Sequence, residues 1–170
     1  FRTQTPRRAQ KGHDYKSDTD ISLEEAYHGT NRRINVNGKV LQIHIKPGVK
    51  EEQVLRMREK GGQGINGGPR GDIYITLHIP EHQYYKRKGN DLYCDIPVEL
   101  YTAILGGKQA IRTLKGNIRI DIPKETENEK ILRLKGMGMP VFGKTGEYGD
   151  LYATVKIVLP KNLSGKELEI

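Results

Sequence analysis

The chain has 170 residues and a formal net charge of +8, and 35% of its residues are hydrophobic. No apolar run approaches the roughly 18 residues that a membrane helix needs, which excludes a membrane-spanning helix. The single cysteine, Cys94, excludes an internal disulfide and a zinc site built from cysteines alone. It lies in the alternating run DLYCDIPV, where we expect a small buried residue.

The N-terminal segment FRTQTPRRAQKG is basic and contains no acidic residue. Such a single-signed segment is typical of a flexible linker or arm, so we expect residues 1–11 to be the end of a basic linker. Within it, Arg7, Arg8 and Lys11 are candidate nucleic-acid contacts. Four of the chain's 29 basic residues lie here, and the other 25 accompany 21 acidic ones. A mixed-sign, solvated surface explains that balance without a nucleic-acid groove.

The sequence contains an internal repeat. The segment GDIYITLHI returns 78 residues later as GDLYATVKI. Further upstream the offset is 77, since residues 21–34 align with residues 98–111, and one residue is inserted between Gly61 and Gly71. Two tandem copies of one small domain explain this pattern. We expect the copies to span residues 12–80 and 81–162.

Within the first copy, one helix and several strands are predicted. In SLEEAYHG, Ser22 can cap the helix, Glu25 closes a capping box, and Gly29 ends the helix. In INVNGKVLQIHI, apolar and polar residues alternate around Asn37-Gly38, a pair that favours a type I′ hairpin. GDIYITLHI and DLYCDIPV also alternate, as strands do.

These signals predict a mainly β protein. We expect two tandem small β-sandwich or barrel domains of the same topology, each with one short helix. In the tail NLSGKELEI, Ser164 and Glu167 repeat the capping signal. Residues 163–170 are therefore expected to be the start of a truncated C-terminal helix.

Two segments resemble site motifs without the structure that those motifs need. HIPEH (78–82) has the spacing of an inverted zinc-protease motif, but Pro80 prevents His78 and His82 from sharing a helix face. GQGING (62–67) has dinucleotide-binding spacing, but a strand follows it instead of a helix, so we expect a flexible hairpin loop. We expect no metal site, and nothing in the sequence argues for an enzyme.

Several ordered segments carry a family resemblance: ISLEEAYHGT, KPGV, VLRMREKGGQGINGGPRGDIYITLHI, DLYCDIPVELYTAILGG and LRLKGMGMP before GDLYATVKI. Over residues 12–163 they resemble the C-terminal region of DnaJ-type J-domain co-chaperones. The resemblance implies two tandem β-sandwich domains that bind unfolded client polypeptides and deliver them to a DnaK-type chaperone. In such proteins a C-terminal helix pairs two protomers, so the implied full-length state is a homodimer. Because the helix is cut after one turn, we expect this fragment to be mostly monomeric.

Two motifs of the family are absent. The sequence has no His-Pro-Asp triplet of a J-domain and no C-x-x-C-x-G-x-G zinc-finger repeats. The resemblance is therefore to the zinc-finger-less, curved-DNA-binding-protein-A-like subgroup, and it implies no cofactor and a cytoplasmic location, with nucleoid association as an alternative. The alternative function is that of a basic DNA-binding module. The tyrosines weaken it, because they lie in strand alternation and are not interleaved with arginines.

On the family's pattern, the first copy holds a client segment in an apolar groove beside a strand edge. The matching positions are Ile34, Val36 and Ile75, although ordinary core residues are the alternative interpretation. The strand before the helix departs from the pattern, because it places Ser17 and Thr19 where apolar residues are usual. We expect a shallower, more polar groove that includes Thr19, with client binding of about micromolar strength or weaker.

Some family members also bind the acidic C-terminal tail of the partner chaperone beside this groove. Arg32 stands at the matching position, with Arg33 and Lys39 nearby, and arginine can bind a carboxylate through two hydrogen bonds. A solvated strand end is the alternative for these residues. Asp72 and Asp150 follow glycine in both copies, and we interpret them as turn-forming. A rigid spacer between paired protomers is a third interpretation of the tandem copies.

Overall fold

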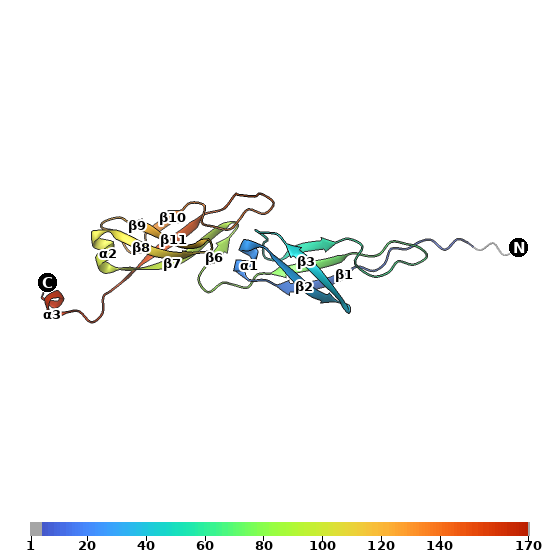
Figure 1. Ribbon diagram of the computed structural model, residues 1–170, viewed down its shortest axis with the longest axis horizontal. Coiled ribbons are helices and arrows are strands. Elements are labelled where there is room, and N and C mark those ends of the chain that lie inside the picture. Colours follow the sequence, from blue (N-terminus) through green and yellow to red (C-terminus); the bar gives the residue numbers. More distant parts are fainter. Residues whose placement is uncertain (1–4, 170) are drawn as a thin grey trace. The chain divides into compact units, whose positions relative to one another are not determined.

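The computed structural model describes residues 5–169, so residues 1–4 of the predicted linker and Ile170 of the predicted tail helix lie outside the described residues. The described chain forms eleven strands and three short helices. It divides into two compact units, Phe1–Pro80 (unit 1) and Glu81–Ile170 (unit 2) (Figure 1). The predicted mainly β, two-domain fold class is confirmed. None of the helices within residues 5–169 is long and apolar enough to cross a membrane.

Unit 1 consists of a three-stranded sheet, a separate two-stranded hairpin and one short helix. In the sheet, the central strand β5 pairs in parallel with β1 and antiparallel with β4. The hairpin joins β2 and β3 in antiparallel register. The elements are β1 (Tyr15–Asp20), α1 (Leu23–His28), β2 (Thr30–Val36), β3 (Lys39–Ile45), β4 (Gln53–Met57) and β5 (Ile73–His78).

Unit 2 repeats this arrangement with one additional strand. Its sheet has the order β10-β11-β7-β6, and its hairpin joins β8 and β9. Ser164 caps the tail helix α3 through the predicted capping box with Glu167, whereas pairing of two protomers through this segment stays a prediction. The elements are β6 (Lys86–Lys88), β7 (Asp91–Glu99), α2 (Leu100–Leu105), β8 (Gly107–Thr113), β9 (Gly116–Ile122), β10 (Ile131–Leu134), β11 (Leu151–Val158) and α3 (Gly165–Leu168).

The central strand β5 shows how the sheet of unit 1 buries one face. Side chains alternate between the two faces of a strand, so Ile73, Ile75 and Leu77 point the same way, and each is at most 1% exposed. Tyr74, on the opposite face, is half-buried. Burying one large aliphatic side chain stabilises a fold by about 1.5–3 kcal/mol. This row therefore forms part of the core of unit 1.

The predicted helix cap and hairpin turn are both present. The hydroxyl of Ser22 accepts the N–H of Glu25 (3.1 Å), and the carboxylate of Glu25 accepts the N–H of Ser22 (3.2 Å). Asn37 and Gly38 have φ angles of 48° and 80°, the positive values that a type I′ turn requires. Both features depend only on residues close in the chain, which is why the sequence predicted them.

An aspartate holds the same turn in both units. In unit 1, Asp72 accepts the N–H of Glu59 (2.9 Å) and two hydrogen bonds from the guanidinium of Arg56 (2.7 and 3.0 Å). These bonds lower the pKa of Asp72 from 3.8 to about 2. The aspartates thus secure a turn, as interpreted, and also form an ion pair that the sequence did not predict. Unit 2 repeats these contacts with Asp150, Gly136 and Arg133.

The N-terminal segment is bonded to the β4–β5 loop from Gln10 onward, a contact that the sequence did not predict. Two backbone hydrogen bonds join Gln10 and Ile65 (2.9 and 3.0 Å), and another joins Gly12 to Pro69 (2.9 Å). A Cβ added to Gly12 would lie only 2.0 Å from the carbonyl oxygen of Gly62. Glycine therefore lets the two segments pack backbone to backbone, and they project past the strands of unit 1 (Figure 1).

Candidate functional site

The strands β1 and β2 meet at a junction where no ladder of hydrogen bonds joins them. Among the described residues, β1 pairs only with β5 and β2 only with β3, yet β1 and β2 are in contact. Both strands carry half-buried side chains, which include Ser17 and Thr19 on β1 and Arg32 and Ile34 on β2. We call the junction the slot. An unpaired strand edge offers N–H and C=O groups to an extended peptide, and half-buried side chains leave surface for it to cover.

The structure places the four predicted groove residues at different depths. Ile34 and Thr19 are half-buried, whereas Val36 is 5% exposed and Ile75 has no exposed surface. Ile75 is paired in register with Ser17, so the two side chains lie on the same, buried face of the sheet. Ile34 and Thr19 are thus the residues that a peptide can touch, and Val36 and Ile75 belong to the core that supports them. The groove stays a prediction.

The corresponding junction of unit 2, between β7 and β8, is sealed. The residues that match Ser17, Thr19 and Ile34 are Cys94, Ile96 and Ile111. Their exposed fractions are 6%, 1% and 2%, respectively. The two copies of the fold therefore differ in exposure at the same three positions.

Two consecutive tyrosines fill the junction of unit 2. The hydroxyl of Tyr85 donates a hydrogen bond to the carbonyl oxygen of Arg112 on β8. The hydroxyl of Tyr84 is hydrogen-bonded to Cys94 on β7, and burial raises the pKa of Tyr84 to about 12. The two rings meet edge to face, with centroids 4.6 Å apart. The pair therefore bridges the two strands.

Sequence reasoning missed this pair of tyrosines. The matching positions of the first copy are Arg7 and Arg8, so two aromatic residues in one copy align with two cationic residues in the other. This replacement of two cationic residues by two aromatic residues was the sequence signal that could have revealed the pair. In unit 1 the carbonyl oxygen of Arg8 accepts a hydrogen bond from Asn66 in the β4–β5 loop (3.5 Å). This part of the chain therefore follows the loop and does not cover the slot.

Arg32 is engaged by other groups of unit 1. Its guanidinium lies 2.8 Å from each carboxylate oxygen of Glu25 and donates a hydrogen bond to the carbonyl oxygen of Asp20 (2.6 Å). Hydrogen bonding by Arg32 lowers the pKa of Glu25. An acidic tail that binds Arg32 would have to displace Glu25, whereas Arg33 and Lys39 are exposed. The tail-binding role of these three basic residues stays a prediction.

His78 and His82 lie in different surroundings. His78, at the end of β5, forms ion pairs with Glu51 (3.3 Å) and Asp18 (3.8 Å). The hydrogen bond with Glu51 raises the pKa of His78. The ring nitrogen Nδ1 of His82 instead accepts the backbone N–H of Tyr84 (3.0 Å). The two histidines therefore have separate roles in holding chain segments in place.

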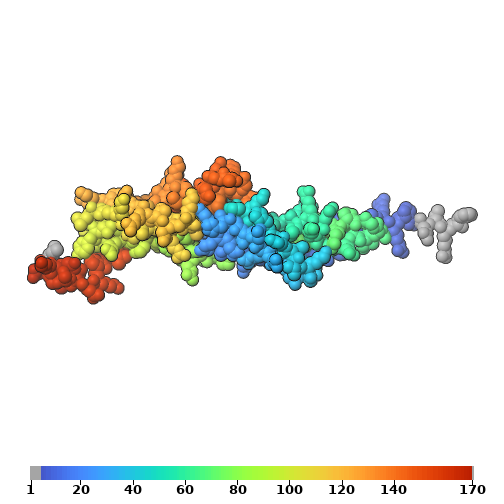
Figure 2. All heavy atoms as spheres, in the orientation of Figure 1, coloured from blue at the N-terminus to red at the C-terminus, as the bar shows by residue number. Residues whose placement is uncertain are grey.

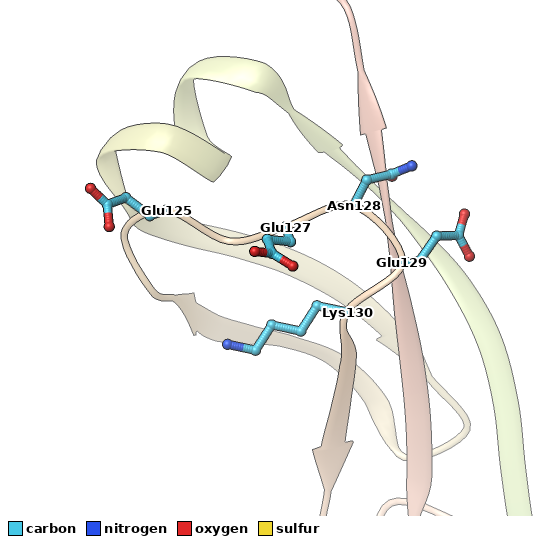
Figure 3. Close-up of a pocket in the computed structure, with 5 residues that line it drawn as sticks. All are labelled: Glu125, Glu127, Asn128, Glu129 and Lys130. Atoms are coloured by element: carbon cyan, nitrogen blue, oxygen red, sulfur yellow. The ribbon is translucent and has the colours of Figure 1, made fainter.

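A depression in unit 2 is lined by the loop from Glu125 to Lys130. Figure 3 shows that the side chains of Glu125, Glu127 and Glu129 point in different directions and do not converge on a common centre. Within residues 5–169, no group of three or more His, Cys, Asp or Glu side chains is arranged to hold a metal ion. The slot of unit 1 is thus the candidate site.

Comparisons with known proteins connect this fold to one family. A model of the DnaJ C terminal domain matches residues 15–160. "Chaperone protein DnaJ 2" of Thermus thermophilus is 38% identical over 161 residues, which are 95% of this chain and 55% of that protein. "Chaperone protein DnaJ" of Brucella anthropi is 40% identical over 131 residues, 76% of this chain and 34% of that protein. The protein of the same name from Sinorhizobium medicae is 39% identical over 136 residues, 79% of this chain and 36% of that protein.

The chain therefore spans between about a third and just over half the length of these curated relatives. Neither comparison addresses the predicted zinc-finger-less subgroup, which stays a prediction. The family model covers both units, from the first residue of β1 to beyond the end of β11. This chain belongs to the DnaJ C-terminal domain family.

Proposed function

We propose that this chain is the client-binding part of a J-domain co-chaperone. In this proposal the slot of unit 1 binds segments of unfolded or non-native polypeptides, which the whole protein delivers to a DnaK-type chaperone in the cytoplasm. Membership of the DnaJ C-terminal domain family supports a chaperone role, and the relatives are named chaperone proteins. A peptide strand added to an open edge forms backbone hydrogen bonds whatever its sequence, which suits a binder of many clients.

One observation carries the proposal: the slot is open in unit 1, and the same junction is filled in unit 2. Tyr84 and Tyr85 come from outside the β7–β8 pair, and Tyr85 bonds the backbone of β8. The fold can therefore accommodate a further chain segment at this junction. In unit 1, Thr19 and Ile34 are only half-buried, so the slot can take up a segment of another molecule.

The expected affinity is modest. At most about a third of the Ile34 surface is exposed, so covering it contributes at most about 1 kcal/mol, because fully burying such a side chain contributes about 1.5–3 kcal/mol. Ordering each flexible client side chain costs about 0.5–1.5 kcal/mol. Ser17 and Thr19 add polar surface and little apolar contact. We therefore expect a Kd of about micromolar or weaker, which allows a client to be released.

The test is the substitution Ile34→Ser, with binding of a chemically unfolded protein measured by fluorescence anisotropy. We expect the Kd to rise by up to about fivefold, which corresponds to the loss of at most about 1 kcal/mol of apolar contact. Val40→Ser is the matched control. Val40 lies on the outer face of the same hairpin, is 67% exposed, and is also an aliphatic residue.

The control variant should bind the client as the unchanged chain does. Equal loss of affinity in both variants would mean that the client binds exposed apolar side chains in general and not the slot in particular. Unchanged affinity in Ile34→Ser, with the amide spectrum of unit 1 intact, would exclude the slot as the binding site.

A further inference from the structure

Two exposed Asn-Gly pairs in unit 1 lie in turns of the same kind. Asn37-Gly38 joins β2 to β3, and Asn66-Gly67 lies in the β4–β5 loop. The asparagine and the glycine have φ angles of 48° and 80° in the first pair and of 56° and 78° in the second. The first turn is closed by strand pairing, and the second by a hydrogen bond from the N–H of Gly68 to the carbonyl oxygen of Ile65 (3.1 Å). The two pairs therefore share the geometry of a type I′ turn.

An Asn-Gly pair can lose ammonia without an enzyme. The glycine nitrogen attacks the side-chain carbonyl carbon, Cγ, of the asparagine, and the side-chain amide leaves as ammonia with the proton of the glycine N–H. Glycine allows this approach because it has no side chain beside the nitrogen. Water then opens the cyclic imide and returns a proton to the nitrogen. Opening at one carbonyl gives aspartate, and opening at the other gives isoaspartate, in which the backbone runs through Cβ.

The two pairs differ in what holds the attacking nitrogen. The N–H of Gly38 donates a hydrogen bond to the side-chain oxygen of Asn35 (3.0 Å). Among residues 5–169, no group accepts the N–H of Gly67, and a Cβ added to Gly67 would have no atom within 4 Å. The side-chain amide of Asn66 makes only a long hydrogen bond, to the carbonyl oxygen of Arg8 (3.5 Å). The nitrogen of Gly67 is therefore open to react, whereas that of Gly38 must first give up a hydrogen bond.

We propose that Asn66 is a site of spontaneous deamidation, and that its isoaspartate product releases the N-terminal segment from the β4–β5 loop. Gln10 and Ile65 exchange two backbone hydrogen bonds (3.0 and 2.9 Å) directly before Asn66, and Figure 2 shows the green atoms of the loop beside the blue atoms of the N-terminal segment. A Cβ added to Gly68, at the end of the turn, would lie 2.0 Å from the carbonyl oxygen of Gln10. Isoaspartate inserts a carbon atom into the backbone between Ile65 and Gly68, where this close contact leaves no room for it.

The other product should leave the contact intact. Aspartate keeps the normal backbone, and the side chain at position 66 is exposed. The variant Asn66→Asp therefore reproduces the added charge without the longer backbone, and it should keep the hydrogen bonds between Gln10 and Ile65. The inference concerns this loop alone and does not depend on client binding in the slot.

The test incubates the chain in a mildly alkaline buffer and follows each asparagine by trypsin digestion and mass spectrometry. Trypsin cuts after Lys and Arg, so Asn66 lies in the peptide 61–70 and Asn37 in the peptide 34–39, where fragment spectra distinguish it from Asn35. In the folded chain, Asn66 should convert between about twofold and about tenfold faster than Asn37, the factor that one net hydrogen bond contributes. In urea the two rates should become equal, because neither N–H is held and both pairs follow a β-branched residue.

Asn35→Ala is the matched variant. It removes the acceptor of the Gly38 N–H, so conversion of Asn37 should rise to the rate of Asn66, while the rate of Asn66 should not change. Release of the N-terminal segment is measured by amide hydrogen exchange at Gln10 and Ile65. Protection of these two amides should fall in proportion to the isoaspartate fraction of the chains.

The proposal is wrong if Asn66 converts no faster than Asn37 in the folded chain, or if the same ratio of rates persists in urea. It is also wrong if Asn37 stays slow in Asn35→Ala, since the hydrogen bond would then not be what protects it. Release by isoaspartate is excluded if the amides of Gln10 and Ile65 stay protected in converted chains, or if Asn66→Asp loses their protection equally.

Discussion

Ile34 and Ile75 were both predicted to line the client groove, and the structure separates their roles. Ile75 has no exposed surface and lies in the central strand β5, between β1 and β4. The variant Ile75→Val removes one methyl group from this closely packed position. We expect it to destabilise unit 1 by about 0.5–1.5 kcal/mol, the usual effect of this change in a core. Client affinity should stay within about twofold of the unchanged chain, because the side chain touches only its own unit.

The measurement is urea unfolding followed by amide NMR signals assigned to each unit, since two units unfold in two transitions. With a urea dependence of about 1 kcal/mol/M, the midpoint of unit 1 should fall by about 0.5–1.5 M and that of unit 2 should not move. Ile96→Val is the matched control, because Ile96 is 1% exposed in β7 of unit 2. It should shift the midpoint of unit 2 alone.

A loss of client affinity in Ile75→Val, without a change in the midpoint of unit 1, would refute this reasoning. Ile75 would then reach the client directly, and the burial seen here would not be that of the binding state. A shift of both midpoints by either variant would instead show that the two units do not unfold independently.

Two further predictions concern pH. The pKa of Asp72 is lowered from 3.8 to about 2, so the contribution of Asp72 to the stability of unit 1 is complete above pH 3.8 and is lost as pH falls toward 2. In the variant Asp72→Asn, the urea midpoint of unit 1 should lack the part of its pH dependence that lies between these values. A pH dependence equal to that of the unchanged chain would contradict this prediction. The pKa of His78 is raised above 6.5, so its contribution is complete below 6.5 and is lost as pH rises through the higher folded-state value. The variant His78→Lys copies Lys156, which stands at the matching position of unit 2, and it should remove the loss of stability near neutral pH. If the urea midpoint of unit 1 still declines near neutral pH in this variant, the decline is due to another group.

The parts of the fold that were predicted depend on residues close in the chain or on direct comparison of the two copies. Ser22 and Glu25 form their cap, and Asn37-Gly38 forms its turn, because the partners are at most three residues apart. The contact between the glycine-rich loop and the N-terminal segment was not predicted, for a physical reason. Composition alone does not show that the glycines lie against a second segment, where any side chain would collide with a carbonyl oxygen.

The candidate site was predicted only in outline. Ile34 and Ile111 occupy matching positions in the repeat, and nothing in their immediate sequence distinguishes a half-buried residue from one that is 2% exposed. One segment that differs between the units holds Tyr85, which is 26 residues from Ile111 in sequence but bonds the neighbouring carbonyl of β8. Exposure depends on every segment that packs against a position, and those segments are distant in the chain.

By itself, the sequence determined that this protein is a tandem duplication of a small β fold, with its helix, its hairpins and its family. Repeats can be found by comparing one part of the sequence with another, and caps and turns depend on residues that are adjacent in the chain. Only the tertiary structure decided which copy keeps its strand junction open and that the N-terminal segment is bonded to the β4–β5 loop. Both depend on pairs such as Tyr85 with Arg112 and Gln10 with Ile65. The chain must fold before these residues meet.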